Sequence, residues 1–239
     1  MNYTSTIIEI LLLYLTIEII KSGYYFARGR QENKIFTGKI EPVRKNKKSI
    51  EILIVGDSIG AGVGSSCFEN SVAGRIYGCL SEKFSALLIN LSVSGRKMEG
   101  LMEIPKSHKK YDLLVIFISS NDVVRFTKLK DFGLQTQDVI KKYSRIAKRL
   151  IIIGPANVGR VKLFPIFLRV ILSYRAPKYV GIISKVCLRF DNVTYVNLLR
   201  SPKELGRYPG SFLASDGFHP NDYGHRFWFM MLKPYLNLE

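Results

Sequence analysis

A serine in a glycine-rich turn is the first residue pattern in the chain that could perform covalent chemistry. The segment Gly56-Asp57-Ser58-Ile59-Gly60 directly follows the aliphatic run 51–55. A serine in such a turn at the end of a strand is exposed and lies near free backbone N–H groups, which is what a nucleophile needs. An ordinary turn in which Ser58 caps the next helix would explain the same residues. The turn alone therefore leaves both interpretations open.

An aspartate and a histidine near the other end of the chain could supply a matching base. In Asp216-Gly217-Phe218-His219-Pro220 the two residues stand three positions apart, in a loop bounded by glycine and proline. The carboxylate of Asp216 can fold back onto the imidazole, fix its tautomer and stabilise the imidazolium, so that His219 could take the proton of Ser58. The alternative is a capping or Asx-turn aspartate beside a surface histidine.

Two further turns contain groups that could stabilise a negatively charged oxygen. Ser94-Gly95 follows the apolar run 87–91, and Ser119-Ser120-Asn121-Asp122 follows the run 113–118. A glycine lets its own N–H approach a ligand closely, and an asparagine amide is a neutral donor. With the N–H of Ser58, Gly95 and Asn121 would form a three-donor pocket for a tetrahedral oxyanion. Each turn alone is a weak signal, because these are ordinary turn residues.

Other chemistries match the sequence incompletely. The GxSxG pattern around Ser58 is typical of the α/β-hydrolase elbow, but that fold needs several strands before the serine, and only one is predicted here. Gly60, Gly62 and Gly64 suggest a dinucleotide loop, but Ser65 stands where the motif needs a glycine. The three histidines and three cysteines form neither an HExxH nor a CxxC pattern. We therefore expect no metal and no cofactor.

The elements that must position these residues alternate between short aliphatic runs and helical periods. Val72, Ile76 and Leu80 are spaced four apart, which predicts one face of a helix. Ile140, Tyr143 and Ala147 predict a second helix, and the segment after Pro220 begins the last one, through Phe227 and Met231. The predicted strands are 51–55, 87–91, 113–118, 150–153 and 193–196.

This alternation predicts a parallel sheet of five strands with helices on both faces. In such sheets functional groups gather at the carboxyl ends of the strands. The three turns that contain Ser58, Gly95 and Asn121 should therefore meet at one edge of the sheet. With 239 residues, 47% of them hydrophobic, the chain is long enough for one well-buried α/β domain.

The N-terminal segment differs in composition from the rest. Residues 4–20 are almost entirely apolar, interrupted by Glu9 and Glu18, and basic residues follow from Lys21 onward. A run of this length is at the short end of what spans a bilayer, and a helix packed on the domain is the alternative. The basic residues after the run predict that the globular part lies on the cytoplasmic side of a membrane, as a peripheral or anchored protein. We thus expect an apolar helix and a basic linker over 1–49, and a catalytic domain over 50–239.

The charge balance points to an anionic partner. The chain has 36 basic and 19 acidic residues, a net charge of +17, which favours acidic lipids or nucleic acid. The basic residues are scattered and no helix-turn-helix or RRM-like aromatic signature is present, so nucleic acid is not expected.

The order of the four motifs carries more information than any one of them. Nucleophile, glycine, asparagine and Asp-x-x-His follow one another, each at the end of a candidate strand or in the loop before the last helix, and in this the sequence resembles the SGNH (GDSL-type) hydrolase superfamily. The resemblance covers about 50–228. It implies that Ser58 is the nucleophile, that Gly95 and Asn121 are oxyanion donors, and that Asp216 and His219 complete the triad. One position departs from the pattern, because Ser119 stands where the third motif usually has glycine.

The resemblance also implies a three-layer α/β/α fold of flavodoxin type and metal-free acyl transfer to water. The segment 161–179, in which Leu, Phe, Ile and Tyr alternate with cations, suits a lipid-facing lid, although a helix packed on the core is the alternative. The first expectation is therefore a serine esterase that acts on lipid-like acyl esters near a membrane. A carbohydrate O-acetylesterase is the runner-up, and a non-catalytic lipid-binding protein on a hydrolase scaffold is a third possibility.

Overall fold

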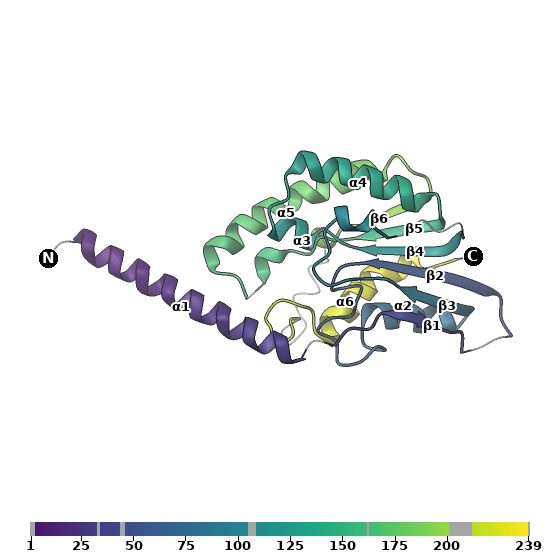
Figure 1. Cartoon of the computed structure of the whole chain (residues 1–239), viewed down its shortest axis with the longest axis horizontal. Helices are drawn as coiled ribbons and strands as arrows, with labels where there is room; N and C mark the ends of the chain where they lie inside the picture. The colour runs from purple at the N-terminus through teal and green to yellow at the C-terminus, as the bar shows by residue number, and fades with distance from the viewer. Residues whose placement is uncertain are drawn as a thin grey trace.

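A mainly parallel sheet between two layers of helices organises the protein (Figure 1). The computed structural model describes residues 3–32, 34–43, 46–104, 109–161, 163–200 and 212–238. The six strands are β1 (Gly38–Ile40), β2 (Ser49–Gly56), β3 (Ser85–Asn90), β4 (Tyr111–Phe117), β5 (Ala147–Ile153) and β6 (Val193–Val196). Their order is β1-β3-β2-β4-β5-β6, and every pair is parallel except β1 with β3. The predicted three-layer α/β fold is confirmed.

Helices cover the two faces of this sheet. The helices are α1 (Tyr3–Glu32), α2 (Val72–Ser81), α3 (Ser120–Val124), α4 (Leu129–Ser144), α5 (Ile166–Cys187) and α6 (Asp222–Leu232). Single turns of 3₁₀ helix lie at Glu99–Leu101, Val158–Arg160, Leu198–Arg200 and Lys233–Tyr235. Figure 1 shows α4 and α5 on one side of the sheet and α2 and α6 on the other.

The central strands are aliphatic on both faces because both faces are buried. In β2, Ile52 and Ile54 belong to the core beneath α2 and α6, which also contains Trp228. Leu53 and Val55, which point to the opposite face, belong to the core beneath α4 and α5, together with Tyr143 and Tyr179. The two cores hold the ends of β2, β3 and β4 in register.

Several elements differ from the sequence prediction. The sheet has six strands instead of five, because Gly38–Ile40 forms an antiparallel edge strand within the segment expected to be helix and linker. The predicted helix through Ala147 ends at Ser144, and Ala147 begins β5. The segment 161–179 contains the first part of α5, whose helix continues through Pro177. Arg44 and Lys45 of the predicted linker lie outside the described residues.

The N-terminal apolar run is part of a longer helix than expected. α1 extends from Tyr3 to Glu32, and Figure 1 shows its N-terminal half projecting away from the domain. Within the described residues, no helix combines the length and apolarity needed to cross a membrane.

Candidate active site

The turn after β2 places Ser58 at the carboxyl edge of the sheet, but the residue is buried, only 5% exposed, and not exposed as the sequence predicted. Its backbone carbonyl accepts a hydrogen bond from the N–H of Val63 at 2.9 Å, which curls the chain around the serine. Gly56 has a φ of +149° and packs against the backbone of Phe117, so a side chain there would overlap the neighbouring strand. The glycine-flanked turn thus requires glycine for close packing, and it places the predicted nucleophile where β2 ends.

Two carboxyl groups are buried beside this turn. Asp57 is 1% exposed, and burial raises its pKa to about 7 although Ile59 N–H donates to it. Asp122 accepts hydrogen bonds from the N–H of Met98 and the hydroxyl of Thr127, and burial raises its pKa to about 6. Asp122 thereby joins the segment of Met98 to the segment after α3, whereas the bond of Asp57 lies within its own turn.

The loop before α6 pairs the predicted base with its aspartate. Asp216 Oδ2 lies 2.6 Å from His219 Nδ1, and Asp216 Oδ1 accepts the backbone N–H groups of Phe218 and His219 at 2.9 Å. Burial of Asp216 opposes ionisation, but its bonds to His219 and to the backbone outweigh this and lower its pKa to about 2. The ionised carboxylate therefore accepts a hydrogen bond from Nδ1–H of His219, which leaves Nε2 as the acceptor.

The loop of His219 packs on the turn of Ser58. A Cβ at Gly64 would lie 3.1 Å from the Cβ of His219 and would overlap the carbonyl of Pro220. Gly64 follows Val63, whose N–H is bonded to Ser58. Residues distant in the sequence are therefore joined by direct backbone packing at one edge of the sheet.

The second and third turns flank the first one. Val93 N–H donates to Gly56 O at 3.0 Å, which ties the segment before Gly95 to the end of β2. Asn121 lies at the start of α3, and its Nδ2 donates to the carbonyl of Arg96, the residue after Gly95, at 3.1 Å. One amide hydrogen of Asn121 is thus used to fix its orientation, and the other is available to a ligand.

Ser119 adopts a backbone conformation that normally requires glycine. Its φ is 89° and its ψ is −15°, it is fully buried, and its hydroxyl finds no partner within the part of the chain described. The backbone at Ser119 therefore has the conformation that the usual glycine would adopt, and the serine is strained in it. The turn keeps its shape although the residue differs.

His225 has a structural role beside the site. It is fully buried; its Nδ1 accepts from the N–H of Val72 at 3.3 Å, and Nε2–H donates to Val63 O at 3.0 Å. Burial lowers its pKa to about 4, so the ring is neutral at pH 7. His225 thereby joins α6 to α2 and to Val63, whose N–H donates to the carbonyl of Ser58.

Two further residues border the site that the sequence did not single out. A Cβ at Gly95 would lie 3.2 Å from Nη2 of Arg125, which places an exposed cation beside the predicted oxyanion donor. The ring of Tyr25, from α1, lies 2.8 Å from the Cβ position of Gly217 in the loop of His219. The sequence could have placed Arg125 beside the site, because it stands four residues after Asn121. The place of Tyr25 could not be predicted in this way, because it depends on how α1 packs on the domain. Among the described residues, no group of three or more acidic, histidine or cysteine side chains could hold a metal ion.

Comparison with known proteins identifies the family and the fold of the chain. The model of the GDSL-like Lipase/Acylhydrolase family matches residues 54–227. No curated protein matches the chain. An acetylxylan esterase from Geobacillus stearothermophilus has a similar structure, with a TM-score of 0.64 at 17% identity, over 82% of this chain and 98% of the other. An alpha/beta hydrolase from the metagenome of Lake Arreo, Spain, gives a TM-score of 0.59 at 19% identity, over 80% of this chain and 96% of the other.

The structural similarities support the fold, and the family match extends over most of the chain, from β2 into α6. The roles of individual residues stay predictions from the sequence motifs and the geometry. On this evidence the chain belongs to the GDSL-like lipase/acylhydrolase family and is a serine hydrolase of carboxylic esters.

Proposed function

We propose that the protein removes a short acyl group, such as acetyl, from a hydroxyl group of a carbohydrate. Ser58 is the nucleophile, His219 the general base and acid, and Asp216 the residue that orients the imidazole. The N–H groups of Ser58 and Gly95 and the amide of Asn121 bind the oxyanion. No cofactor takes part in this scheme.

The reaction proceeds in two acyl-transfer steps. His219 Nε2 takes the proton of Ser58 as its Oγ attacks the ester carbonyl, and the resulting imidazolium is stabilised by Asp216. Collapse of the tetrahedral intermediate breaks the bond to the sugar oxygen, which receives the proton from His219. A water that gives its proton to His219 then attacks the acyl-enzyme. The bond between the acyl carbon and Ser58 Oγ breaks, the carboxylic acid leaves, and His219 returns the proton to Ser58.

The observation that carries this proposal is the 2.6 Å contact between Asp216 and His219 in a loop packed on the turn of Ser58. A capping aspartate beside a surface histidine would not need this pairing. The side chain of His219 is also only 14% exposed. The pair is therefore oriented by the fold and suited to accept a proton.

One observation favours a carbohydrate ester over the lipid-like ester expected first. The structural neighbours include proteins described as acetylxylan and acetyl-xylooligosaccharide esterases. A cavity of about 580 Å³ adjoins the segment that contains Gly95. Its lining is more apolar than polar, and the amide of Asn90 in it is already hydrogen-bonded to Phe36 and Gly60, so the cavity does not decide between the two classes of ester.

Labelling with a fluorophosphonate probe tests the assignment of the nucleophile. The native protein should be labelled, and Ser58→Ala should not. Ser66→Ala is a matched control, because Ser66 is an exposed serine of the same glycine-rich segment and should leave labelling unchanged. Equal labelling of native protein and Ser58→Ala would overturn the assignment.

A series of esters tests the substrate class. We expect p-nitrophenyl acetate to be hydrolysed faster than the octanoate and palmitate esters, and acetate to be released from acetylated xylo-oligosaccharides or other acetylated glycans. Faster turnover of the long-chain esters would instead support the lipid-like substrate. Asp216→Asn should lower kcat by about 10⁴-fold, the effect of losing the carboxylate in a triad, with little change in KM.

A further inference from the structure

The N-terminal half of α1 is an apolar helix without a covering layer. Of the residues from Ser5 to Ile20, only Leu15 and Glu18 are not exposed. Ile10, Leu11, Leu12 and Leu13 are 63%, 58%, 58% and 64% exposed, and consecutive residues of a helix point about 100° apart. The exposed apolar surface therefore runs around the whole helix. Such a helix normally lies in an apolar environment.

A second exposed apolar face lies on the first half of α5. Five large side chains, at positions i, i+1, i+4, i+5 and i+8, share one side of this helix. They are Ile166, Phe167, Val170, Ile171 and Tyr174, with exposures between 44% and 71%. Lys178 lies over the ring of Tyr174, with Nζ 4.4 Å from the ring centroid, which places a cation at the border of the apolar face.

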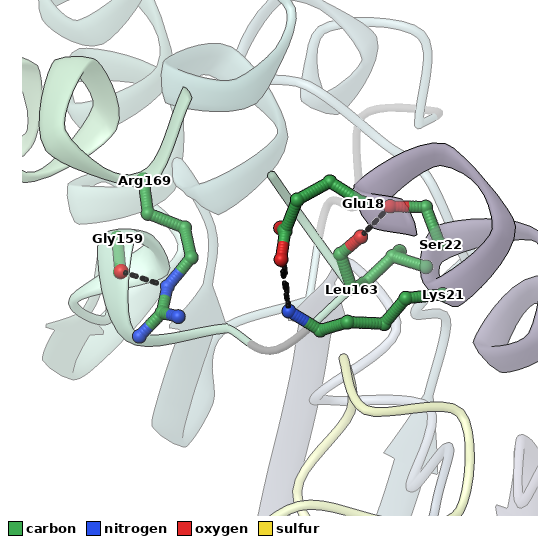
Figure 2. A network of polar contacts seen from close by, with 6 residues as sticks. All are labelled: Glu18, Lys21, Ser22, Gly159, Leu163 and Arg169. Carbon is green, nitrogen blue, oxygen red and sulfur yellow. Dashed lines mark hydrogen bonds and ion pairs between the residues drawn. The ribbon is translucent and has the colours of Figure 1, made fainter. Parts of the chain in front are cut away.

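A polar junction holds α1 against the segment that leads into α5 (Figure 2). Ser22 Oγ donates to the carbonyl of Leu163 at 2.6 Å, and the buried Glu18 is neutralised by Lys21 at 3.0 Å. On the other side of the junction, Arg169 Nε donates to the carbonyl of Gly159 at 3.0 Å. These contacts fix the exposed apolar part of α1 relative to the exposed face of α5.

The distribution of charge identifies what covers these surfaces. The chain has a net charge of +17, and its basic residues follow the apolar part of α1 directly, from Lys21 onward. A second copy of the chain would cover one side of a helix, whereas lipid covers all sides. Basic residues beside an apolar helix are attracted to anionic headgroups.

We infer that residues 5–20 of α1 and the exposed face of α5 together form a binding surface for an anionic lipid bilayer. This surface lies outside the catalytic residues. Together with the proposed function, it implies that the ester substrate belongs to a membrane-attached molecule. α1 is continuous from this surface to Tyr25, which packs on the loop of His219. Bilayer binding thus holds the ester-cleaving site beside the lipid surface.

Co-sedimentation of the full chain with vesicles tests the inference. We expect binding to vesicles of phosphatidylcholine and phosphatidylglycerol, weaker binding to phosphatidylcholine alone, and a loss of affinity as salt rises. Leu12→Glu should weaken binding by at least about tenfold, because it removes one buried leucine and adds a charge. Glu9→Gln should strengthen binding, because it removes an acidic group from the apolar surface.

A matched control separates this surface from general effects of an added charge. Leu134 of α4 is 56% exposed, close to the 58% of Leu12, and lies outside the surface, so Leu134→Glu should bind as the native protein does. Far-UV circular dichroism and turnover of p-nitrophenyl acetate report whether Leu12→Glu is folded, with Ile8→Glu as a second variant of the same surface.

The outcomes distinguish the bilayer from other partners and from the catalytic proposal. Equal vesicle binding by Leu12→Glu and Leu134→Glu would overturn the inference. So would a lipid-free dimer, seen by light scattering, that Leu12→Glu converts to a monomer. Ser58→Ala should bind vesicles as the native protein does, so that the failure of one proposal leaves the other testable.

Discussion

Replacing Ser119 by glycine should stabilise the protein, although most substitutions of buried residues do the opposite. The serine holds a φ of 89° at a position of no exposure. A non-glycine residue with a positive φ costs about 1–2 kcal/mol, which glycine avoids. The larger backbone entropy of glycine in the unfolded chain cancels roughly 0.5–1 kcal/mol of this gain. The backbone change alone is therefore worth about 0.5–1 kcal/mol in favour of glycine.

The unpartnered hydroxyl of Ser119 adds a second contribution. Removing a buried hydroxyl that lacks a partner relieves about 1 kcal/mol, at the low end of the usual desolvation cost. Ser119→Ala keeps the Cβ and the unfavourable φ, so it should gain only this part, whereas Ser119→Gly gains both, about 1.5–2 kcal/mol. For a domain of this size the expected increases in Tm are about 2–4 °C for alanine and about 3–8 °C for glycine.

Thermal and urea unfolding of three variants measure this effect. Ser120→Gly is the control, because Ser120 is the next residue but already lies in the helix α3, where glycine should destabilise by about 0.5–1 kcal/mol. If Ser119→Gly were no more stable than Ser119→Ala, the backbone would not be strained at this position and the reasoning would be refuted.

The remaining predictions concern the groups around the same site. The pKa of His225 is lowered to about 4, so between about pH 6.5 and 4 the unfolded chain binds a proton that the folded chain does not. The free energy of unfolding should therefore fall as the pH drops through this range. Urea unfolding should show this dependence on pH in the native protein, and His225→Gln should lack it. Burial raises the pKa of Asp57 to about 7, so the folded state loses stability as the pH rises from about 4 to 7. The free energy of unfolding of Asp57→Asn should therefore increase relative to that of the native protein over this range. A constant difference between the two would contradict this. Gly217→Ala should lower esterase turnover by pressing on the ring of Tyr25, and the double variant with Tyr25→Ala should recover part of the loss; additive effects in this cycle would show that the two residues do not interact.

The sequence predicted the site better than it predicted the surroundings of the site. Ser58, Gly95 and Asn121 stand directly after aliphatic runs, so a parallel sheet brings them to one edge whatever the lengths of the helices. Asp216 and His219 are close in sequence, and their pairing is a local property of the loop. For these reasons the motifs located the candidate site without knowledge of the tertiary structure.

The elements that were missed depend on contacts between distant residues. β1 has only three residues, and it becomes a strand because the edge of β3 offers unpaired backbone groups. α5 continues through Pro177, where the local sequence favours a break, because Ala176, Tyr179 and Val180 are buried against the domain. The contacts of Ser22 and Tyr25 in α1 could not be predicted from the local sequence, because their partners Leu163 and Gly217 lie far along the chain.

The contact between Tyr25 and Gly217 makes α1 a lever as well as a support. With Ser22 as the pivot, the arm to Ser5 is about 26 Å and the arm to Tyr25 about 4.5 Å, at 1.5 Å per residue. A sideways shift of about 3 Å at the far tip therefore moves the ring of Tyr25 by roughly 0.5 Å, which is the precision that a catalytic group requires. Preparations that trim the helix, or hold its tip in a rigid support, should therefore be compared with the intact chain before their turnover rates are taken as intrinsic.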